Sequence, residues 1–469
     1  MNAGIASNAV DRRESNGATE YSLPKARWHF IMLLLTAIYA LAFVDRQIVN
    51  ILAEQIKIDL KLTDWQIGAL AGPAFALFYV LAGIPLARIA ERCNRIFLLS
   101  GVLAVWSGFT ALSGLAQTFI QLVVARIFVG ASESGCVPAA HSLISDITPR
   151  AKRSTALAMF SLGLPLGSLL GLTAGGFIAE HFSWRAAFLL VGAPGLILAL
   201  LLLALFRDPR LSKALQPVTR KMLTAPETQE AGKARSNQDD VPPFSIVMRQ
   251  LLATPSFVWM TLAASVLSVA SYGQATFYAS FFLRNHASQI EELAIASGTG
   301  GPLAFLGLTL GLATGITGMI GTALGGRLGD KFASTGFKGY MTIPIFVMAV
   351  GTPLTMSAML VPDVRWAIFL LATAAVLKSM WYGPVFATIQ GLVAPRSRAT
   401  AVSVFLTLMN GFGLGLGPIA LGGLSDALAP QLGSADALRW SMVSFTLLVF
   451  LAAFCFWRAR KRMPEDPIS

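Results

Sequence analysis

The sequence predicts an all-α membrane protein in which twelve transmembrane helices form two pseudo-symmetric bundles of six. The first observation is composition: 55% of the 469 residues are hydrophobic and only 13% are charged, against about 25% charged in soluble proteins. The second is the length of the apolar runs, since a helix needs about 20 mostly apolar residues to cross a bilayer and satisfies its own backbone hydrogen bonds there. Such runs occupy residues 28–50, 65–87, 96–115, 119–142, 154–179, 186–206, 255–283, 303–326, 340–361, 366–391, 399–425 and 438–457.

The third observation is a repeat that relates the two halves. The segment Thr148-Pro149-Arg150 and the residues up to 160, after the fourth span, are echoed by residues 394–405 after the tenth. The sixth and twelfth spans begin with Trp184-Arg185 and with residues 439–440, Arg-Trp. Repeats of this kind build membrane proteins in which a binding site lies between halves that rock against each other.

Polar stretches set the expected domain boundaries. We expect a cytoplasmic tail at 1–27, the first bundle at 28–206, a cytoplasmic linker at 207–252, the second bundle at 253–457 and a cytoplasmic tail at 458–469. The linker is rich in Pro, Lys, Arg, Gln and Asp, a composition typical of mobile segments, with room for a short surface helix. Residues 1–27 lack an apolar core, so no cleavable signal peptide is expected.

The net charge of +12 reflects membrane topology rather than nucleic-acid binding. With a cytoplasmic N-terminus, the tails and the even-numbered loops hold 27 of the 36 Lys and Arg residues, the odd-numbered loops hold six and the spans hold three. This positive-inside bias predicts a multi-pass protein of the cytoplasmic (inner) membrane with both termini in the cytoplasm. The basic charge can contact anionic membrane lipids.

Five charged residues fall inside the predicted spans. Asp45 and Arg46 lie in the first span, Arg126 and Glu133 in the fourth, and Lys378 in the tenth. A charge at the bilayer centre costs from about 3 to more than 10 kcal/mol, so each is expected to face a partner or a wet cavity. Arg126 and Glu133 are two helical turns apart and share a face. We predict that Asp45 and Glu133 compete for the two arginines as a proton-responsive switch, with Glu133 preferred and Asp45 an open alternative as proton carrier; a static ion-pair cluster is the other interpretation.

Lys378 lies near the middle of the tenth span, too deep to reach the membrane surface easily, so we expect it in a cavity. One interpretation is recognition of an anionic head group, and the other is a hydrogen bond to a neighbouring helix carbonyl. Three buried cations against two acids favour an anionic or zwitterionic substrate. The further candidate substrate contacts are Arg46, Tyr272, Gln274, Trp381 and Tyr382.

Several motifs resemble the major facilitator superfamily. The segment from Gly83 to Arg95 is similar to that family's G-x-x-x-D-R-x-G-R-R signature, with Glu91 in place of Asp and Asn94 in place of Gly, and residues 326–331 look like a second copy. Within the superfamily, residues 44–46, 125–134, 383–385 and 393–399 resemble the Spinster group of lipid transporters. The resemblance implies that the charges of spans one and four act in coupling.

The same resemblance implies a cytoplasmic latch that stabilises an outward-open state. Its candidate residues are Gly83, Arg88, Glu91, Arg92, Arg95, Asp146 and Arg150. The alternative explanation is that these arginines only contribute to the excess of positive charge on the cytoplasmic side. The acidic Glu91 among them favours the latch.

Glycines recur at every fourth position in span five (163, 167, 171 and 175) and in span eight (307, 311 and 315). Such stripes let helices approach closely. Tight packing is the favoured interpretation; since spans five and eight face each other in the resembling superfamily, a sliding surface is the alternative.

No enzymatic site emerges from the sequence. The four histidines are scattered, no Cys/His spacing is that of a metal site, and the glycine runs lie in apolar spans without a Walker motif. We therefore expect no enzyme activity, no cofactor, no metal and no ATP-driven pumping.

These residues predict a proton-coupled secondary active transporter that works by alternating access on an amphipathic anion or zwitterion. The Spinster resemblance implies a lysophospholipid or sphingoid-phosphate-like substrate. A transporter of small organic acids or drugs on the same fold is one alternative, and a non-transporting membrane sensor is another. The expected partners are membrane lipids, the small substrate and protons, with no nucleic acid, and the protein is expected to be a monomer.

Overall fold

The computed structural model describes residues 25–149, 152–206, 208, 244–332, 336–394 and 397–463, without the side chains of Lys25, Glu91, Arg92, Ser154 and Ala399. The helices of the first half are α1 (Lys25–Leu60), α2 (Asp64–Ala71), α3 (Pro73–Arg92), α4 (Arg95–Ser113), α5 (Phe119–Glu133), α6 (Cys136–Ile147), α7 (Arg153–Ser161), α8 (Gly163–His181) and α9 (Trp184–Leu205). Those of the second half are α12 (Phe244–Ala253), α13 (Pro255–Asn285), α14 (Ala287–Ser297), α15 (Pro302–Phe332), α16 (Gly336–Tyr340), α17 (Thr342–Leu360), α18 (Val364–Ser379), α19 (Tyr382–Gly391) and α20 (Arg398–Lys461).

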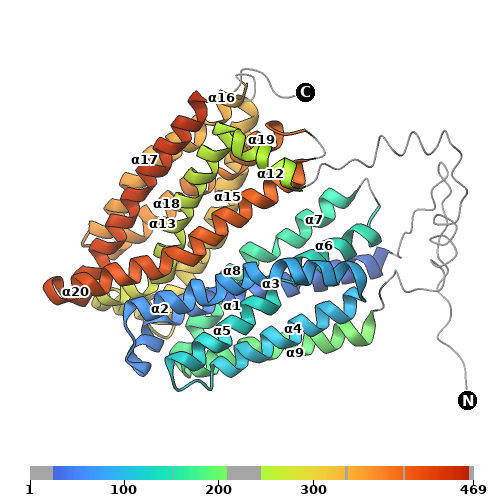
Figure 1. Cartoon of the computed structure of the whole chain (residues 1–469). Coiled ribbons are helices and arrows are strands. Elements are labelled where there is room, and N and C mark those ends of the chain that lie inside the picture. The colour runs from blue at the N-terminus through green and yellow to red at the C-terminus, as the bar shows by residue number, and fades with distance from the viewer. Residues whose placement is uncertain are drawn as a thin grey trace, which may run out of the picture.

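The described residues contain twelve membrane crossings. Eleven helical segments are long and apolar enough to cross a bilayer, and the last of them, Thr400–Lys461, has 62 residues, about three times the length that one crossing needs. Its backbone leaves the helical region at Gly433 (φ 75°, ψ 163°), and its orange and red parts run back in opposite directions (Figure 1). The last segment therefore crosses twice, and the predicted all-α architecture of twelve spans is confirmed.

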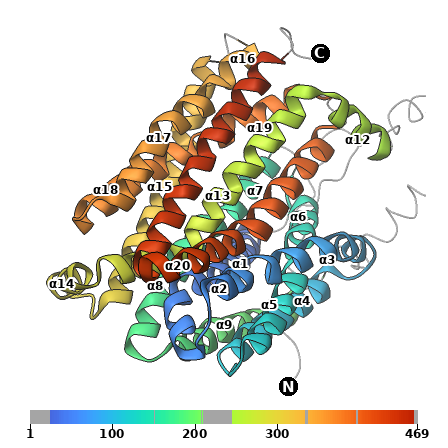
Figure 2. The ribbon, with the colours of Figure 1, turned by 60° about the vertical axis from the view of Figure 1, so that its left-hand side comes forward.

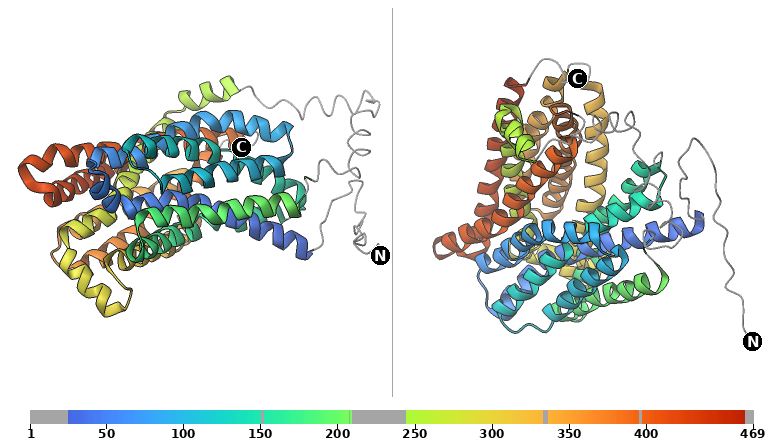
Figure 3. Two further views of the ribbon diagram at one scale, coloured as in Figure 1. Left: turned by 90° about the horizontal axis from the view of Figure 1, so that it is seen from below. Right: turned by 45° about the vertical axis from the view of Figure 1, so that its right-hand side comes forward.

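The helices form two groups that meet at one end and diverge toward the other (Figures 1 and 2). One apolar core joins α1, α3, α4, α5, α6, α7 and α9 of the first half, and another joins α12, α13, α16, α17, α19 and α20 of the second half. The groups diverge toward the ends that carry Lys25 and Met463, as a second pair of views also shows (Figure 3). We call the opposite end, where they meet, the far end. The predicted linker, 207–252, lies mostly outside the described residues, and its last part forms α12.

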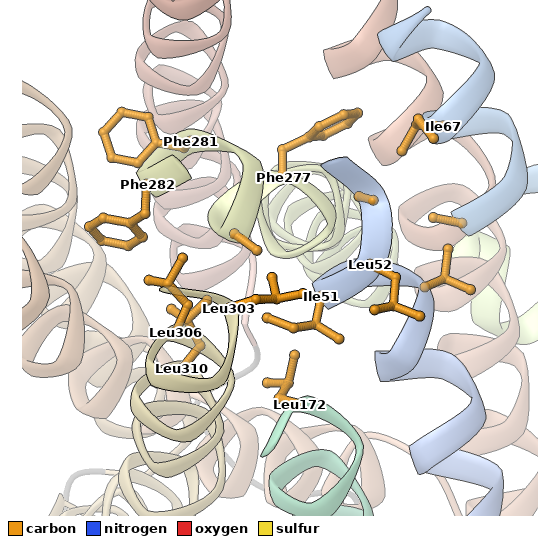
Figure 4. Packing of buried hydrophobic residues seen from close by; sticks show 14 of the residues in the cluster. Ile51, Leu52, Ile67, Leu172, Phe277, Phe281, Phe282, Leu303, Leu306 and Leu310 are labelled. Carbon is orange, nitrogen blue, oxygen red and sulfur yellow. The ribbon is translucent and has the colours of Figure 1, made fainter. Parts of the chain in front are cut away.

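A shared apolar cluster joins the halves near the far end. Figure 4 shows Ile51 of α1 and Leu172 of α8 facing Leu303 and Leu306 of α15, with Phe277 of α13 above them. All five side chains are at most 5% exposed. Burying an apolar side chain of this size stabilises a structure by about 1.5–3 kcal/mol, so the cluster favours the closed arrangement of this end.

The glycine stripe of span five packs inside the first bundle. A Cβ added to Gly167 would lie 2.1 Å from the carbonyl oxygen of Ala40, and one on Gly163 would lie 2.8 Å from that of Thr36. These glycines therefore let α8 approach α1, which agrees with packing rather than with sliding between halves. The stripe of span eight instead packs across the halves, since Cβ atoms added to Gly307 and Gly315 of α15 would lie 2.4 and 3.3 Å from carbonyl oxygens of α8. Gly176 of α8 packs against Gly307 from the other side.

Gly307→Val is expected to force the far end apart. A Cβ at Gly307 would lie 2.4 Å from the carbonyl oxygen of Leu172, and overpacking of this kind costs about 1–3 kcal/mol, roughly a fivefold to hundredfold shift in a two-state population. Spin labels at the exposed positions Phe182 and Ile295, one on each half, report the separation. Gly318→Val is the matched control, because its nearest neighbour would be 4.0 Å away. An unchanged distance distribution in Gly307→Val would contradict this account of the interface.

Candidate functional site

A cavity of about 380 Å³ lies between the two bundles. Both halves contribute: Arg46 comes from α1, Arg126 from α5 and Lys378 from α18. Its lining among the described residues contains these three cations and no Asp or Glu. Most of the remaining wall is aromatic or aliphatic and is formed by Phe43, Ala71, Phe75, Leu164, Leu172, Leu267, Ala275, Leu310, Ala313, Leu371, Ala374, Ala375, Trp381 and Leu414. The cavity thus combines cationic groups with a large apolar surface.

Breaks in the fourth and tenth spans position two of the buried charges. Pro138 and Pro384 are each the third residue of the helix that resumes the span, α6 and α19. Proline has no N–H for the residue four positions earlier and clashes with its carbonyl, so each span is interrupted just before it. Glu133 is the last residue before one break and Lys378 the last but one before the other. The two halves therefore place opposite charges at equivalent breaks.

Arg46 and Glu133 form an ion pair beside the cavity, in which Glu133 is buried and the Arg46 side chain is 24% exposed. Glu133 Oε1 accepts hydrogen bonds from Arg46 Nε at 3.0 Å and from Nη2 at 2.5 Å. The arginine also lies 4.8–4.9 Å from the ring centres of Phe43, Phe75 and Tyr79, where the ring faces attract a cation. Glu133 Oε2 is buried without a hydrogen-bond partner in the described part of the chain. That free acceptor makes this carboxylate costly to bury in its charged form.

Arg126 and Asp45 lie together without forming an ion pair. Arg126 Nη1 donates to the backbone oxygen of Asp45 at 3.3 Å, and Arg126 Nε has no partner among the described residues. The Asp45 carboxyl group is 2% exposed, and the described chain places no cation within ion-pair distance of it. In this conformation only one of the predicted carboxylate–arginine pairs, Glu133 with Arg46, is formed.

The predicted substrate contacts separate into two groups. Tyr272, Trp381 and Tyr382 line the cavity together with Lys378, whereas Gln274 is fully buried behind its wall. Tyr272 donates to Asn410 Oδ1 at 3.0 Å, and the rings of Trp381 and Tyr382 stack with centres 4.3 Å apart. Lys378 Nζ donates to Gln274 Oε1 at 3.2 Å. The acceptor is thus a side-chain amide and not the helix carbonyl that one interpretation expected.

The predicted latch residues form contacts within the first half. Arg95 is fully buried and pairs with Asp146 at 2.7 Å and with Asp208 at 2.6 Å. Arg88 is exposed, and Gly83 lies against α5–α6, where an added Cβ would be 3.9 Å from that of Ser134. Arg150 lies outside the described residues, as do the side chains of Glu91 and Arg92. Of the predicted latch residues, the structure thus brings Arg95 and Asp146 together as an ion pair.

A charged cluster that the sequence did not single out closes the far end. Arg284 of α13 reaches across to the first half and donates to both Glu54 and Asp64, at 2.7 and 2.8 Å. Asp64 also accepts from Lys57 Nζ at 2.6 Å and from Ser425 of α20 at 2.7 Å. One feature of the sequence could have indicated this cluster: Arg284 is one of only six basic residues in the odd-numbered loops.

Two carboxylates reinforce this closure by capping helices of the opposite half. Asp426 of α20 accepts from the backbone N–H groups of Asp64 and Trp65 at the start of α2, at 3.0 and 2.7 Å. Glu180 of α8 accepts from the N–H of Leu303 at the start of α15, at 2.6 Å. The first N–H groups of a helix lack partners within it and attract negative charge. Each half therefore caps a helix of the other.

Two six-helix bundles that surround a charged central cavity, closed at one end, are the architecture of a membrane transporter. The chain belongs to the Major Facilitator Superfamily, whose sequence profile matches residues 35–418. It is 30% identical over 469 residues to an MFS-type efflux pump of Mycolicibacterium smegmatis, covering 100% of this chain and 99% of that one.

Similarity to the Spinster group is confirmed by a solved structure and a plant relative. The crystal structure of a bacterial homolog to the human lysosomal transporter Spinster, in an inward-facing and unoccupied conformation, is 28% identical with a TM-score of 0.80, covering 95% of this chain and 100% of that one. The Arabidopsis thaliana protein named "Probable sphingolipid transporter spinster homolog 2" is 25% identical over 76% of this chain and 69% of its own length. The protein is therefore a multi-pass membrane transporter with a Spinster-like structure.

Proposed function

We propose that the protein is a secondary active transporter that moves a single-chain anionic or zwitterionic lipid, of the lysophospholipid or sphingoid-phosphate type, by alternating access. One observation carries the proposal: among the described residues, three cations and no acid line a cavity whose other walls are mainly apolar. Arg46 and Arg126 line the cavity from one half and Lys378 from the other, so an anionic substrate held by them would contact both halves. Phosphate binds well to arginine and lysine through charge-assisted hydrogen bonds.

The apolar walls support an amphipathic substrate rather than a small hydrophilic acid. Leu164, Leu172, Leu267, Leu310 and Leu371 come from both halves and leave room for an acyl or sphingoid chain beside the charged groups. The name of the plant relative gives sphingolipids as the cargo of that protein, which agrees with this class.

Drug efflux is the second candidate function. The relative from Mycolicibacterium smegmatis is named an efflux pump, and stacked aromatic rings at Trp381 and Tyr382 suit planar apolar compounds as well as lipid chains. The lipid and drug proposals differ in the role of Arg46, Arg126 and Lys378, because only the lipid proposal requires all three to bind a phosphate group.

We further propose that transport is coupled to protons at Glu133 or Asp45, in the cytoplasmic membrane with both termini in the cytoplasm. In this proposal Glu133 alternates between two forms. The ionised carboxylate attracts Arg46, and the protonated carboxyl group does not. The distribution of Lys and Arg supports the orientation. On that orientation the far end faces outward, and the described conformation is inward-facing.

Lys378→Gln tests the assignment of the head-group site. We expect the affinity for oleoyl lysophosphatidate to fall about tenfold or more, since a hydrogen bond to a charged group contributes roughly 1.5–3 kcal/mol. Affinity for monooleoylglycerol, which has the same chain without phosphate, should change less than about twofold on the same reasoning. Binding to the purified protein is measured by fluorescence titration.

Lys152→Gln is the control for this test, because it removes the same charge at an exposed position. Equal losses for both lipids in Lys378→Gln would contradict the head-group site. Tighter binding of hydrophilic organic acids or drugs than of either lipid would favour the second candidate.

A further inference from the structure

Gln274 is a fully buried polar side chain near the cavity. It belongs to α13, is 0% exposed and lies between α18 and α20. Its Nε2 donates to the backbone oxygen of Met442 at 3.0 Å and to Thr446 Oγ1 at 2.6 Å, both on α20. A buried amide needs hydrogen-bond partners for its donors and acceptor, because each buried polar group without a partner lowers stability by about 1–3 kcal/mol.

The hydrogen-bond network settles which way this amide points. The Met442 carbonyl can only accept, and the Thr446 hydroxyl already donates to that carbonyl at 2.9 Å. Both groups therefore require a donor from Gln274, so the NH₂ group must face α20. The amide oxygen then faces the opposite direction, toward α18 and the cavity.

The amide oxygen receives two donors from the cavity side. Lys378 Nζ donates at 3.2 Å and the Tyr278 hydroxyl at 3.3 Å, which fills both lone pairs of the oxygen. The ammonium group has three hydrogens, and the described structure uses one of them in this bond. No carboxylate of the described chain lies within ion-pair distance of Lys378. The lysine is thus held by a neutral acceptor, and its charge is not compensated.

We propose that Gln274 is a positioning residue: held from α20, it fixes the Lys378 ammonium at the cavity wall by a neutral acceptor and so preserves its charge for an anionic head group. The inference rests on the proposed function, since it assumes that Lys378 binds the head group. It assigns Gln274 an action through Lys378 and not a contact with substrate. A glutamate in its place would supply an acceptor of similar length but would neutralise the lysine.

Gln274→Leu and Gln274→Glu, each alone and combined with Lys378→Gln, test the proposal. The readout is the ratio of the dissociation constants for oleoyl lysophosphatidate and monooleoylglycerol, together with KM and kcat for lysophosphatidate in vesicles. We expect Gln274→Leu to lower discrimination between the lipids at least fivefold, through KM and with kcat nearly unchanged. Gln274→Glu should lower it at least as far. Neither should change discrimination further in the Lys378→Gln background.

The double variants separate positioning from a merely structural role. Residues that act through one another are not additive in such a cycle, whereas general damage would lower binding of both lipids with or without Lys378. Thr446→Val removes one of the two acceptors of the amide and gives a milder test if the Gln274 variants fold poorly; we expect a twofold to threefold loss of discrimination.

The outcomes distinguish this inference from the proposed function. If Lys378→Gln lowers lysophosphatidate affinity while Gln274→Leu, Gln274→Glu and Thr446→Val leave discrimination unchanged, the positioning role is overturned and the head-group site stands. Additive losses in the double variants also overturn it. If Lys378→Gln itself leaves discrimination unchanged, the head-group site fails and this inference fails with it.

Discussion

Arg284→Ala is expected to shift the protein from the conformation closed at the far end to one that is open there, by at least about tenfold. Arg284 joins the two halves at the far end, because it forms ion pairs with Glu54 and Asp64 of the other half. Its side chain is only 8% exposed. Removing one partner of a buried ion pair costs about 3–5 kcal/mol. Without Arg284, Glu54 loses its ion-pair partner and Asp64 keeps only Lys57 of its two cations. In the open conformation water can reach Glu54 and Asp64, so the loss falls mainly on the closed state.

The same pair of spin labels, at Phe182 and Ile295, measures this shift. The distribution of distances should gain a longer component in Arg284→Ala. Arg185→Ala is the matched control, since Arg185 forms its ion pair with Asp59 inside the first half and near the surface. A closed far end in both variants would show that the apolar cluster at Ile51, Leu172 and Leu303 suffices to hold it.

Glu133→Gln is expected to abolish accumulation driven by a pH gradient, with a loss of more than about tenfold, while exchange of substrate at equal pH persists. The amide keeps the shape of the side chain, but it neither releases a proton nor attracts Arg46 as a charge. A pH gradient therefore has no group at this position through which to act. The measurement is uptake of radiolabelled lysophosphatidate into proteoliposomes with and without an imposed pH gradient.

Two further variants complete this experiment. Asp59→Asn is the control, because Asp59 is exposed and pairs at the surface. Asp45→Asn identifies the other candidate carrier: if it abolishes accumulation while Glu133→Gln retains it, the coupling lies at Asp45, and our preference for Glu133 is contradicted.

Much of the fold was predictable because each transmembrane helix needs an apolar stretch long enough to cross the bilayer. The residues at which the helices begin and end were harder to predict. Span one ends at Leu60 in the structure, well beyond the apolar run that ends at residue 50, because Glu54 and Lys57 find partners on other elements. The final helix, α20, is continuous over 64 residues except at Gly433, whose positive φ of 75° separates the two crossings that the apolar runs 399–425 and 438–457 predicted.

The candidate site was predictable where chemistry alone marks a residue. Charges inside spans are costly, so Arg46, Arg126 and Lys378 stood out and do line the cavity. Gln274 was singled out as a polar residue of span seven, but its orientation depends on Met442 and Thr446, more than 160 residues away in the chain. The partners of Arg284 are likewise set by tertiary structure, and the sequence marks this residue only as one of the few basic residues of the odd-numbered loops.

Accessibility of a single cysteine tests most directly whether the central cavity opens to one side of the membrane at a time. Ser271, on the cavity wall, is changed to cysteine in a background without Cys93, Cys136 and Cys455, and an impermeant thiol reagent is added to one side of oriented vesicles. We predict labelling only from the side of the termini in this background, and labelling from the far side once Arg284→Ala is added. Labelling from both sides in the same unmodified state, or none from the far side in any variant, would contradict alternating access through this cavity.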